Sequence, residues 1–438
     1  MCSFLVTNKQ IENLDYVNYY LKFRGPDHTE IVEENGWTMI HNLLSITGDF
    51  TSQPISKDNV FLVFNGEVYN FLDSNKYYKS DAYFILDEYF SKGEDFVKNL
   101  DGEFALVLLD FNKNVLYFSS DIFCTKPIFV SSENKKIGIA SYKSSLERLG
   151  FSNFQRLTPN TLYKLDITNW TLTHNTIHDW DLTQNIDSYD LWEEAFFESL
   201  NKRTIFTRNS FLVPMSSGYD SGSIVCGLLN STNKKDFITY SFFGNEDRNV
   251  IETRLHTHEK KYFNNSITTF QKNEVINAMK EIVEPFYYGP SPQIKTHEGF
   301  DDKGAIGLFY LLREMKEKEN IKVQLSGQGG DEITGNLSTY GFNTRNPNPW
   351  PNDLKSVFPW GNFYYGANWS YLNKEECIAG SLGIETRYPL LDKKVVQSFI
   401  NLTPEYKNRF YKSPLRNFMT KYKFPFKEEK LGFNLQII

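Results

Sequence analysis

The sequence predicts a two-domain α/β protein, with a packed-sheet first domain and a parallel-sheet second domain. Two observations support this prediction. Short apolar runs separated by turn residues fill residues 1–175, with few helical stretches between them. After residue 190, apolar strands alternate with helical segments, which is typical of a parallel sheet with crossover helices. A polar, poorly periodic segment at 176–190 is the expected linker between domains 1–175 and 191–438.

The expected elements of the first domain follow from short runs rich in β-branched and aromatic residues. The predicted strands are 61–64, 104–111, 115–120 and 136–141, and the predicted helical stretches are 8–22 and 81–98. Strands that follow one another with few helices between them favour two sheets packed face to face.

The expected elements of the second domain alternate between the two kinds. They are a helix at 191–204, a strand at 211–215, a helix from 224, a strand at 236–244, a helix at 304–319 and a strand at 321–327. Residues 341–363 are rich in Asn, Pro and Trp and predict an irregular surface excursion. Open parallel sheets bind ligands at the carboxyl ends of their strands, so the residues that follow 211–215 and 321–327 are candidates for a site.

Composition restricts the function classes. The 438 residues carry a net charge of −7, and aromatic residues make up 16% of the chain. An acidic chain argues against a nucleic-acid binder that relies on bulk positive charge. The four cysteines are far apart and form no CxxC pair, so the sequence suggests neither a disulfide scaffold nor a zinc site. No apolar run approaches the length of a membrane span, and no N-terminal signal is present, so a cytoplasmic protein without membrane partners is expected.

Two glycine- and serine-rich loops follow the two candidate strands. The first is Ser216-Ser217-Gly218-Tyr219-Asp220-Ser221, and the second is Ser326-Gly327-Gln328-Gly329-Gly330-Asp331-Glu332. Small side chains let main-chain N–H groups approach an anion, and an aspartate in each loop is a ligand that Mg²⁺ prefers. Each loop alone is equally typical of an ordinary capped turn. Together they predict a metal–pyrophosphate clamp, and the Walker ending Gly-Lys-Ser/Thr is absent.

Cys2 directly follows the initiator methionine. Removal of Met1 would place an α-amine of near-neutral pKa beside the thiol of the same residue. A nucleophile and a base would then belong to one residue. A cysteine without function at this position is the alternative.

Further motifs accompany these features in a fixed order. They are RGPD (24–27), His41 with LSI (44–46), NGEVYN (65–70), Ser80-Asp81, LDGEFAL (100–106), ETRYPLLD (385–392) and KLGF (430–433). In this order and spacing the chain resembles the asparagine synthetase family, the glutamine-hydrolysing class, as a divergent and short member. The resemblance covers nearly the whole chain and implies an N-terminal-nucleophile αββα sandwich followed by an ATP-pyrophosphatase-like domain.

The resemblance implies how the first domain would work. The Cys2 thiolate would attack the side-chain amide of glutamine with the α-amine as base, and Asn65 and Gly66 would form the oxyanion hole. Glu67 and Asp81 would hold the amino group of glutamine. The remaining residues that the resemblance places around glutamine are Arg24, Leu44, Ser45 and Ile46. The ammonia released would travel through an internal channel to the second domain.

In the second domain the resemblance implies that ATP and Mg²⁺ adenylate a carboxylate acceptor, which ammonia then attacks. Asp220 and Asp331 match the metal-binding acids. Lys430 would stabilise charge during acyl transfer, and Glu385 matches a position used for the amine or the second substrate. The residues expected to bind ATP are Met215, Ser216, Ser217, Gly218, Asp220, Ser221, Phe243, Ser326 and Gly327. A homodimer is the assembly to test.

This sequence departs from the family pattern at four places. Leu43 stands where the family has an arginine that pairs with the carboxylate of glutamine. Ser217 replaces a usual glycine, Gln328 replaces a usual glutamate, and Cys124 takes the place of a turn glycine. The first change puts glutamine hydrolysis in question, and together they leave the acceptor open.

Three functions therefore remain. The first is a glutamine-dependent, ATP-consuming amide-forming ligase, with aspartate as the best guess for the acceptor. The second is a related acyl-adenylating amidotransferase or lactam-forming synthetase that acts on a specialised substrate with an impaired glutaminase domain. The third is a catalytically inactive binding or regulatory homologue, against which the retained Asp220 and Asp331 argue.

Overall fold

The computed structural model describes the chain except for residues 1, 206, 208–209, 234–235, 245, 265–268, 289–296, 336, 338–348 and 428–438. The chain forms two compact units. Unit 1 comprises Met1–Asp179 and two short segments from later in the chain, Ile282–Glu284 and Ala379–Glu385. Unit 2 comprises Trp180–Glu281, Pro285–Ile378 and Thr386–Ile438.

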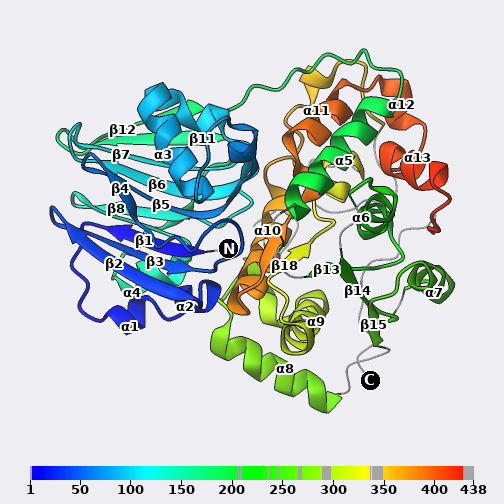
Figure 1. Cartoon of the computed structure of the whole chain (residues 1–438), viewed down its shortest axis with the longest axis horizontal. Helices are drawn as coiled ribbons and strands as arrows, with labels where there is room; N and C mark the ends of the chain where they lie inside the picture. Colours follow the sequence, from blue (N-terminus) through cyan, green and yellow to red (C-terminus); the bar gives the residue numbers. More distant parts are fainter. Residues whose placement is uncertain are drawn as a thin grey trace. The chain divides into compact units, whose positions relative to one another are not determined.

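Unit 1 contains two six-stranded antiparallel sheets, most of whose strands are labelled in Figure 1. The first has the order β10 (Gln155–Arg156), β8 (Phe129–Glu133), β9 (Lys136–Ala140), β1 (Ser3–Thr7), β3 (Trp37–Leu43), β2 (His28–Glu34). The second has the order β12 (Thr171–Thr176), β11 (Thr161–Asp166), β7 (Val115–Ser120), β6 (Gly102–Asp110), β5 (Val60–Val68), β4 (Ile55–Lys57).

The two sheets of unit 1 face each other across one hydrophobic core. Phe4 and Met39 of the first sheet pack with Val63, Val107 and Phe118 of the second. On the outer faces, α3 (Asp81–Lys92) packs on β5, and α4 (Lys143–Arg148) packs on β9. The short helices α1 (Leu14–Val17) and α2 (Leu21–Arg24) lie on the side of the first sheet, as Figure 1 shows. The predicted sandwich of two sheets between helices is confirmed.

This layering explains the composition of β5. One face of the strand meets the opposite sheet and the other meets α3, so nearly every residue of Val60–Val68 is buried. A strand that is buried on both faces has no need to alternate apolar and polar residues. The pair Asn65-Gly66, which alone is also typical of a hairpin turn, lies inside this strand.

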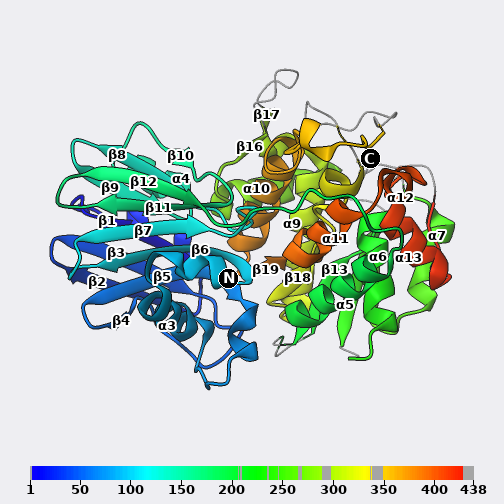
Figure 2. The same cartoon turned by 90° about the horizontal axis from the view of Figure 1, so that it is seen from above.

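Unit 2 is built on a five-stranded sheet, of which Figure 1 labels four strands and Figure 2 labels the fifth, β19. Its order is β15 (Lys261–Asn264), β14 (Phe237–Phe242), β13 (Phe211–Pro214), β18 (Val323–Leu325), β19 (Glu385–Arg387). The pairings of β13 with β14 and β18, and of β14 with β15, are parallel. The predicted parallel sheet is therefore confirmed.

The C-terminal half contains most of the α-helices that the structure describes. They are α5 (Asp190–Thr204), α6 (Tyr219–Asn230), α7 (Arg248–His256), α8 (Thr269–Ile282), α9 (Lys303–Glu319), α10 (Gly366–Ser381), α11 (Lys393–Asn401), α12 (Pro404–Asn408) and α13 (Ser413–Lys421). A small hairpin pairs β16 (Tyr287–Tyr288) with β17 (His297–Glu298). Within unit 2, α6 packs on β13 and is covered by α5 and α13.

Two helical predictions differ from the structure. The stretch predicted as one helix at 8–22 contains only the four-residue helix α1 and the first part of α2. The helix predicted at 81–98 ends as an α-helix at Lys92, because Gly93 adopts φ +58 as its C-cap, and a 3₁₀ segment follows over Gly93–Asn99. Of the irregular excursion predicted at 341–363, residues 341–348 lie outside the described residues, and the rest contains only a short 3₁₀ turn at Leu354–Ser356.

Candidate active sites

The first candidate site lies in unit 1 around Cys2, immediately before β1. Cys2 is 7% exposed, and its thiol accepts a hydrogen bond from the Leu44 N–H. The pKa of the Cys2 thiol is raised to about 11, chiefly by burial, while the charges of Glu385 and Glu67 act in the same direction and the Leu44 hydrogen bond opposes them. The thiol is therefore protonated at neutral pH and needs a base before it becomes a nucleophile.

Asn65 faces Cys2 with a defined amide orientation. The Cys2 N–H donates to Asn65 Oδ1 at 2.9 Å, so the amide nitrogen Nδ2 points the other way. Nδ2 is buried and has no hydrogen-bond partner among the residues that the structure describes. A buried amide N–H without a partner costs folding free energy while no substrate is bound. Such a group could donate a hydrogen bond to an oxyanion that forms beside Cys2.

Gly66 is required by the close packing of β5 against β6. Its φ is +125, and a Cβ atom at this position would lie 1.9 Å from the carbonyl oxygen of Glu103. Any other residue would push β6 away and disturb the strand that positions Asn65. The adjacent Asn65 and Gly66 therefore act as one structural unit beside Cys2.

Two acids predicted to hold an amino group lie near this site. Glu67 accepts a hydrogen bond from the Thr47 hydroxyl at 2.9 Å, and Asp81, the first residue of α3, accepts one from the Val68 N–H at 3.0 Å. Burial raises the pKa of Asp81 to about 7, and the negative charge of Glu385 adds to the effect. Glu385 is fully buried and belongs to unit 1 through the segment Ala379–Glu385.

Arg24 is fully buried and contacts the main chain of the nucleophile. Its Nε donates to the Cys2 carbonyl at 2.8 Å, and Nη1 donates to the Tyr142 hydroxyl at 3.2 Å. Gly380 provides the space, because a Cβ there would lie 2.6 Å from Nη1 of Arg24. These contacts give Arg24 a role in positioning Cys2, and its predicted role in substrate binding stays a prediction.

The segment after β3 lines the same region. Leu44 and Ile46 are buried, and Ser45 is half-buried with its N–H donating to Asp27 at 2.8 Å. Leu43, the last residue of β3, is also buried and is only 6% exposed. His41 is buried as a neutral ring, since burial lowers the pKa of its imidazole to about 3.

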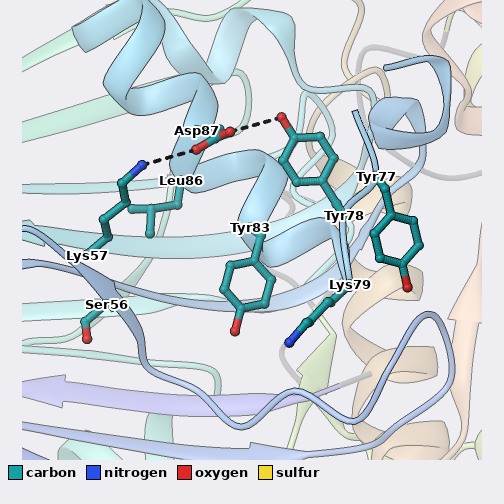
Figure 3. A pocket seen from close by; sticks show the side chains of 8 residues that line it. All are labelled: Ser56, Lys57, Tyr77, Tyr78, Lys79, Tyr83, Leu86 and Asp87. Atoms are coloured by element: carbon teal, nitrogen blue, oxygen red, sulfur yellow. Dashed lines mark hydrogen bonds and ion pairs between the residues drawn. The ribbon is translucent and has the colours of Figure 1, made fainter. Parts of the chain in front are cut away.

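A surface pocket of about 430 Å³ lies elsewhere on unit 1, between β4 and the first half of α3. Figure 3 shows that Asp87 joins Lys57 and Tyr78, while Tyr83 and Lys79 contribute further side chains to the lining. None of the predicted catalytic residues lines this pocket.

The second candidate site lies in unit 2, where β13 and β18 end beside each other. The loop 216–218 leads from β13 into α6, which carries Asp220 in its first turn. The loop 326–330 follows β18. Glycines let the loops approach closely, because a Cβ at Gly330 would lie 2.0 Å from Asp220 Oδ1 and one at Gly327 would lie 2.7 Å from Asp220 Cβ.

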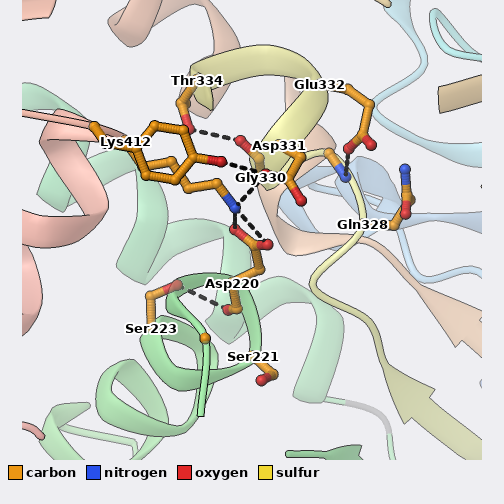
Figure 4. Close-up of polar contacts among 12 residues, drawn as sticks. Asp220, Ser221, Ser223, Gln328, Gly330, Asp331, Glu332, Thr334 and Lys412 are labelled. Carbon is orange, nitrogen blue, oxygen red and sulfur yellow. Dashed lines mark hydrogen bonds and ion pairs between the residues drawn. The ribbon is translucent and has the colours of Figure 1, made fainter. Parts of the chain in front are cut away.

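Asp220 and Asp331 converge on one cation, the ammonium of Lys412. Figure 4 shows Lys412 between the two loops, with Nζ 2.5 Å and 2.6 Å from the carboxylate oxygens of Asp220 and 2.9 Å from Asp331 Oδ1. Tyr411 donates a further hydrogen bond to Asp331 at 2.7 Å. Burial alone would lower the pKa of Lys412, but the two carboxylates hold that pKa well above its usual value. Lys412 is therefore a permanent cation at this site.

Glu332 lies next to Asp331, one of the two aspartates that bind Lys412. Burial raises the pKa of Glu332 to about 7, and the charges of Asp331 and Asp220 raise it as well. Its Oε2 accepts the Gly329 N–H at 3.1 Å. The site thus holds two carboxylates, one ammonium and one acid that titrates near neutrality.

The other predicted nucleotide residues surround the same loops. Ser221 Oγ accepts the Ser216 N–H at 3.0 Å, and the Ser326 N–H donates to the Arg387 carbonyl at 2.9 Å. Met215 and Phe243 are buried at the ends of β13 and β14. Lys430, the predicted charge-stabilising lysine, lies outside the described residues.

Sequence reasoning missed Lys412 and Tyr411. Lys412 contacts Asp220, which lies 192 positions earlier in the sequence. The chain has 47 lysines and arginines, and nothing in the residues around Lys412 distinguishes it from the others. The indication available was electrostatic, because two half-buried aspartates at adjoining strand ends favour a cation between them.

Comparisons with known proteins give the following similarities. A glutamine amidotransferase domain model matches residues 1–180, and an asparagine synthase model matches residues 191–375. A Methanocaldococcus jannaschii protein assigned to the glutamine-hydrolysing asparagine synthetases is 24% identical over 90% of this chain and 74% of its own length. The glutamine-hydrolysing asparagine synthetase of Asparagus officinalis is 26% identical over 88% of this chain and 66% of its own. The glutamine-hydrolysing asparagine synthetase 1 of Lotus japonicus is 24% identical over 93% of this chain and 69% of its own length.

Proposed function

We propose that this chain, which belongs to the glutamine-hydrolysing asparagine synthetase family by its two domains, is a glutamine-dependent, ATP-consuming ligase that forms an amide. The observation that carries the proposal is the pair of Cys2 and Asn65, because a thiol beside an unpartnered buried amide N–H suits acyl transfer. Aspartate is the acceptor we propose, with asparagine as the product. The reaction takes place in the cytoplasm, which suits four free thiols, and a homodimer is the assembly to test by light scattering.

In the first half-reaction the Cys2 thiolate attacks the side-chain amide carbon of glutamine. The carbonyl oxygen becomes an oxyanion, which accepts hydrogen bonds from Asn65 Nδ2 and the Gly66 N–H. Collapse expels ammonia and leaves a thioester, which water hydrolyses to glutamate. Because the pKa of the Cys2 thiol is about 11, a base must take its proton, and the α-amine exposed by removal of Met1 serves this role.

In the second half-reaction the acceptor carboxylate attacks the α-phosphate of ATP. Pyrophosphate leaves, and the acyl-adenylate that results has a good leaving group where the free carboxylate had none. Ammonia from the first half-reaction attacks the acyl carbon, and AMP leaves. Lys412 supplies a fixed positive charge beside the departing phosphates.

The carboxylates of Asp220 and Asp331 fit Mg²⁺ as part of a nucleotide complex. They are hard oxygen donors whose oxygens already converge on one cation. Among the described residues no cluster of three or more metal-ligating side chains occurs, so phosphate oxygens and water would complete the coordination. When bound, Mg²⁺ would neutralise charge on the phosphates.

The test uses the purified protein with glutamine, ATP and a panel of carboxylates that includes aspartate. We expect glutamate release from glutamine, and pyrophosphate release that depends on aspartate and yields asparagine. Pyrophosphate release with another carboxylate but not with aspartate would overturn the proposed acceptor while leaving the ligase activity. If neither glutamate nor pyrophosphate is released, the proposed ligase activity is refuted.

A second candidate function is favoured by Leu43. The side chain is buried beside the glutamine residues and cannot pair with a carboxylate, and Arg24 is already bonded to the main chain of Cys2. A ligase that acts on a specialised acceptor, with an impaired glutaminase domain, would tolerate this arrangement. Such an enzyme would ignore glutamine and use ammonia or an amine of its own substrate.

Leu43→Arg distinguishes the two candidates. If glutamine binds weakly for want of an ion pair, the variant should lower the KM for glutamine about 10- to 100-fold, since a hydrogen-bonded ion pair is worth roughly 1.5–3 kcal/mol. The matched control is Leu172→Arg, the same change at an exposed residue of β12, which should leave KM unchanged. A wild-type KM below the millimolar range would refute weak binding.

The pKa of Asp81 predicts a pH dependence. Its carboxyl is protonated below about pH 7 in the free protein, and only the ionised form attracts the ammonium of glutamine. The value of kcat/KM for glutamine should therefore rise with pH up to about 7 and fall as much as tenfold per unit below it. Glutamate release measured from pH 5 to 9 checks this, and Asp81→Asn should show a shallower acid limb, because only the α-amine of Cys2 then titrates in this range. A wild-type profile that is flat down to pH 5 would contradict the assignment.

A further inference from the structure

Arg254, on α7, is a fully buried cation beneath the loop that follows β13. Its guanidinium donates to three main-chain carbonyls. Nη1 donates to Ser216, Nη2 donates to Gly218 at 3.1 Å, and Nε donates to Pro425 at 2.8 Å. Two of these acceptors belong to the candidate phosphate loop, so the guanidinium holds the inner side of that loop.

The space for this guanidinium is provided by α6. A Cβ at Gly222 would lie 2.5 Å from Nη2 of Arg254 and 2.7 Å from its central carbon. Gly222 lies two positions after Asp220, so the helix that presents the catalytic acid also provides the space for Arg254. A residue with a side chain at this position would displace the guanidinium from the loop.

A second contact joins the same segment to the loop. Glu246 accepts both the N–H of Ser217, at 2.7 Å, and its hydroxyl, and Ser217 Oγ accepts the Asp247 N–H at 3.2 Å. Together, Glu246 and Arg254 thus contact Ser216, Ser217 and Gly218. Burial lowers the pKa of Arg254 to about 10, with the charge of Glu246 opposing the effect, so the guanidinium stays protonated at neutral pH.

The direction of the Gly218 carbonyl decides what the loop presents to a ligand. In a planar trans peptide the carbonyl and the following N–H point in opposite directions. The carbonyl of Gly218 points to Arg254, so the N–H of Tyr219, the first residue of α6, points away from Arg254. Carbonyl oxygens that turned outward would repel phosphate oxygens, whereas N–H groups at a helix N-terminus attract them.

We propose that Arg254 is a positioning residue of the nucleotide site, which holds the carbonyls of Ser216 and Gly218 inward so that the loop presents donors and a positive field to the triphosphate. This inference rests on the proposed function, because it takes ATP as the ligand of the loop. Arg254 acts through the loop and contacts no substrate.

The test compares nucleotide affinity with stability in the full chain. Binding of a non-hydrolysable ATP analogue with Mg²⁺ is measured by calorimetry for wild type, Arg254→Met and Arg254→Lys, together with melting temperature and glutamate release from glutamine. We expect Arg254→Met to weaken analogue binding about 10- to 100-fold, since hydrogen bonds to a charged group are lost. Arg254→Lys should recover part of the loss, and free guanidinium ion added to Arg254→Met should recover part as well.

The matched control is Lys407→Met. Lys407 is another buried basic residue of unit 2, and its Nζ donates to the carbonyls of Ile400 and Leu402 at 2.7 Å and 2.6 Å. Its removal should lower the melting temperature and leave analogue affinity within twofold of wild type. If Arg254→Met behaves like this control, Arg254 is only structural and the inference is overturned.

Two further outcomes are distinguishable. If Arg254→Met does not fold, Arg254→Lys carries the test, because a lysine keeps the charge without the three-pronged contact, and an unchanged affinity would overturn the inference. If wild type itself binds no analogue, the proposed ATP site fails, and the inference fails with it. Weakened binding in Arg254→Met alongside normal glutamate release supports the inference.

Discussion

Cys2→Ala abolishes glutamate release from glutamine and leaves ammonia-dependent synthesis intact: this is the largest effect we expect. In the proposed mechanism the Cys2 thiol is the nucleophile of the first half-reaction, and its main-chain N–H is bonded to Asn65, whose Nδ2 has no partner among the described residues. Removing a covalent nucleophile costs several orders of magnitude in rate. Synthesis with ammonium salt depends on the second domain and should proceed at the wild-type rate.

The matched control for this experiment is Cys124→Ala. Cys124 is also a buried free thiol of unit 1, so the variant has the same chemical change without the predicted nucleophile. Glutamate release should persist in this variant. Loss of both glutaminase and ammonia-dependent activity in Cys2→Ala would refute the division of labour, and intact mass spectrometry of wild type should show that Met1 is removed.

Asp220→Asn and Asp331→Asn should each lower the rate of pyrophosphate release by about a hundredfold or more, since each removes a charge that a magnesium–phosphate complex needs. Both carboxylates bind Lys412, so each variant also leaves part of a buried positive charge uncompensated. Some loss of thermal stability should accompany the loss of rate. The measurement is pyrophosphate release with ATP, aspartate and ammonia.

Asp236→Asn is the matched control, because Asp236 of the same unit forms an exposed ion pair with Lys260. This variant should turn over normally, since an exposed pair contributes little. If Asp220→Asn or Asp331→Asn turns over ATP at the wild-type rate, that aspartate is not part of the metal site. A variant that melts early yet keeps its rate would assign the carboxylate to holding Lys412 alone.

The strands that carry the sites could be predicted from sequence because the residues that mark each strand lie within it or directly after it. The apolar runs around Phe64 and Leu212 match β5 and β13, and the small residues after Leu325 mark the end of β18. The approach of the two loops was also predictable, because both follow strands of one parallel sheet. What makes that approach close is Gly330, whose missing Cβ leaves room for Asp220.

The cations could not be predicted, since they reach the sites only through tertiary structure. Lys412 precedes α13, and Arg254 lies on α7, and neither helix has a pattern that indicates a ligand. The placement of Glu385 had a similar obstacle. Its motif follows the second-domain sequence, yet the structure groups it with Cys2 and Asp81 in unit 1.

The unpartnered amide of Asn65 has a consequence for how this protein tolerates change. A buried donor without an acceptor disfavours the resting fold by about 1–3 kcal/mol, a large share of the stability of an ordinary domain. In the proposed mechanism this donor gains a partner only while the oxyanion is present, so the chain would give up some stability to gain rate. Selection of random variants for heat resistance alone would therefore favour loss of this amide, whereas selection for glutamine-dependent synthesis of the amide product would preserve it.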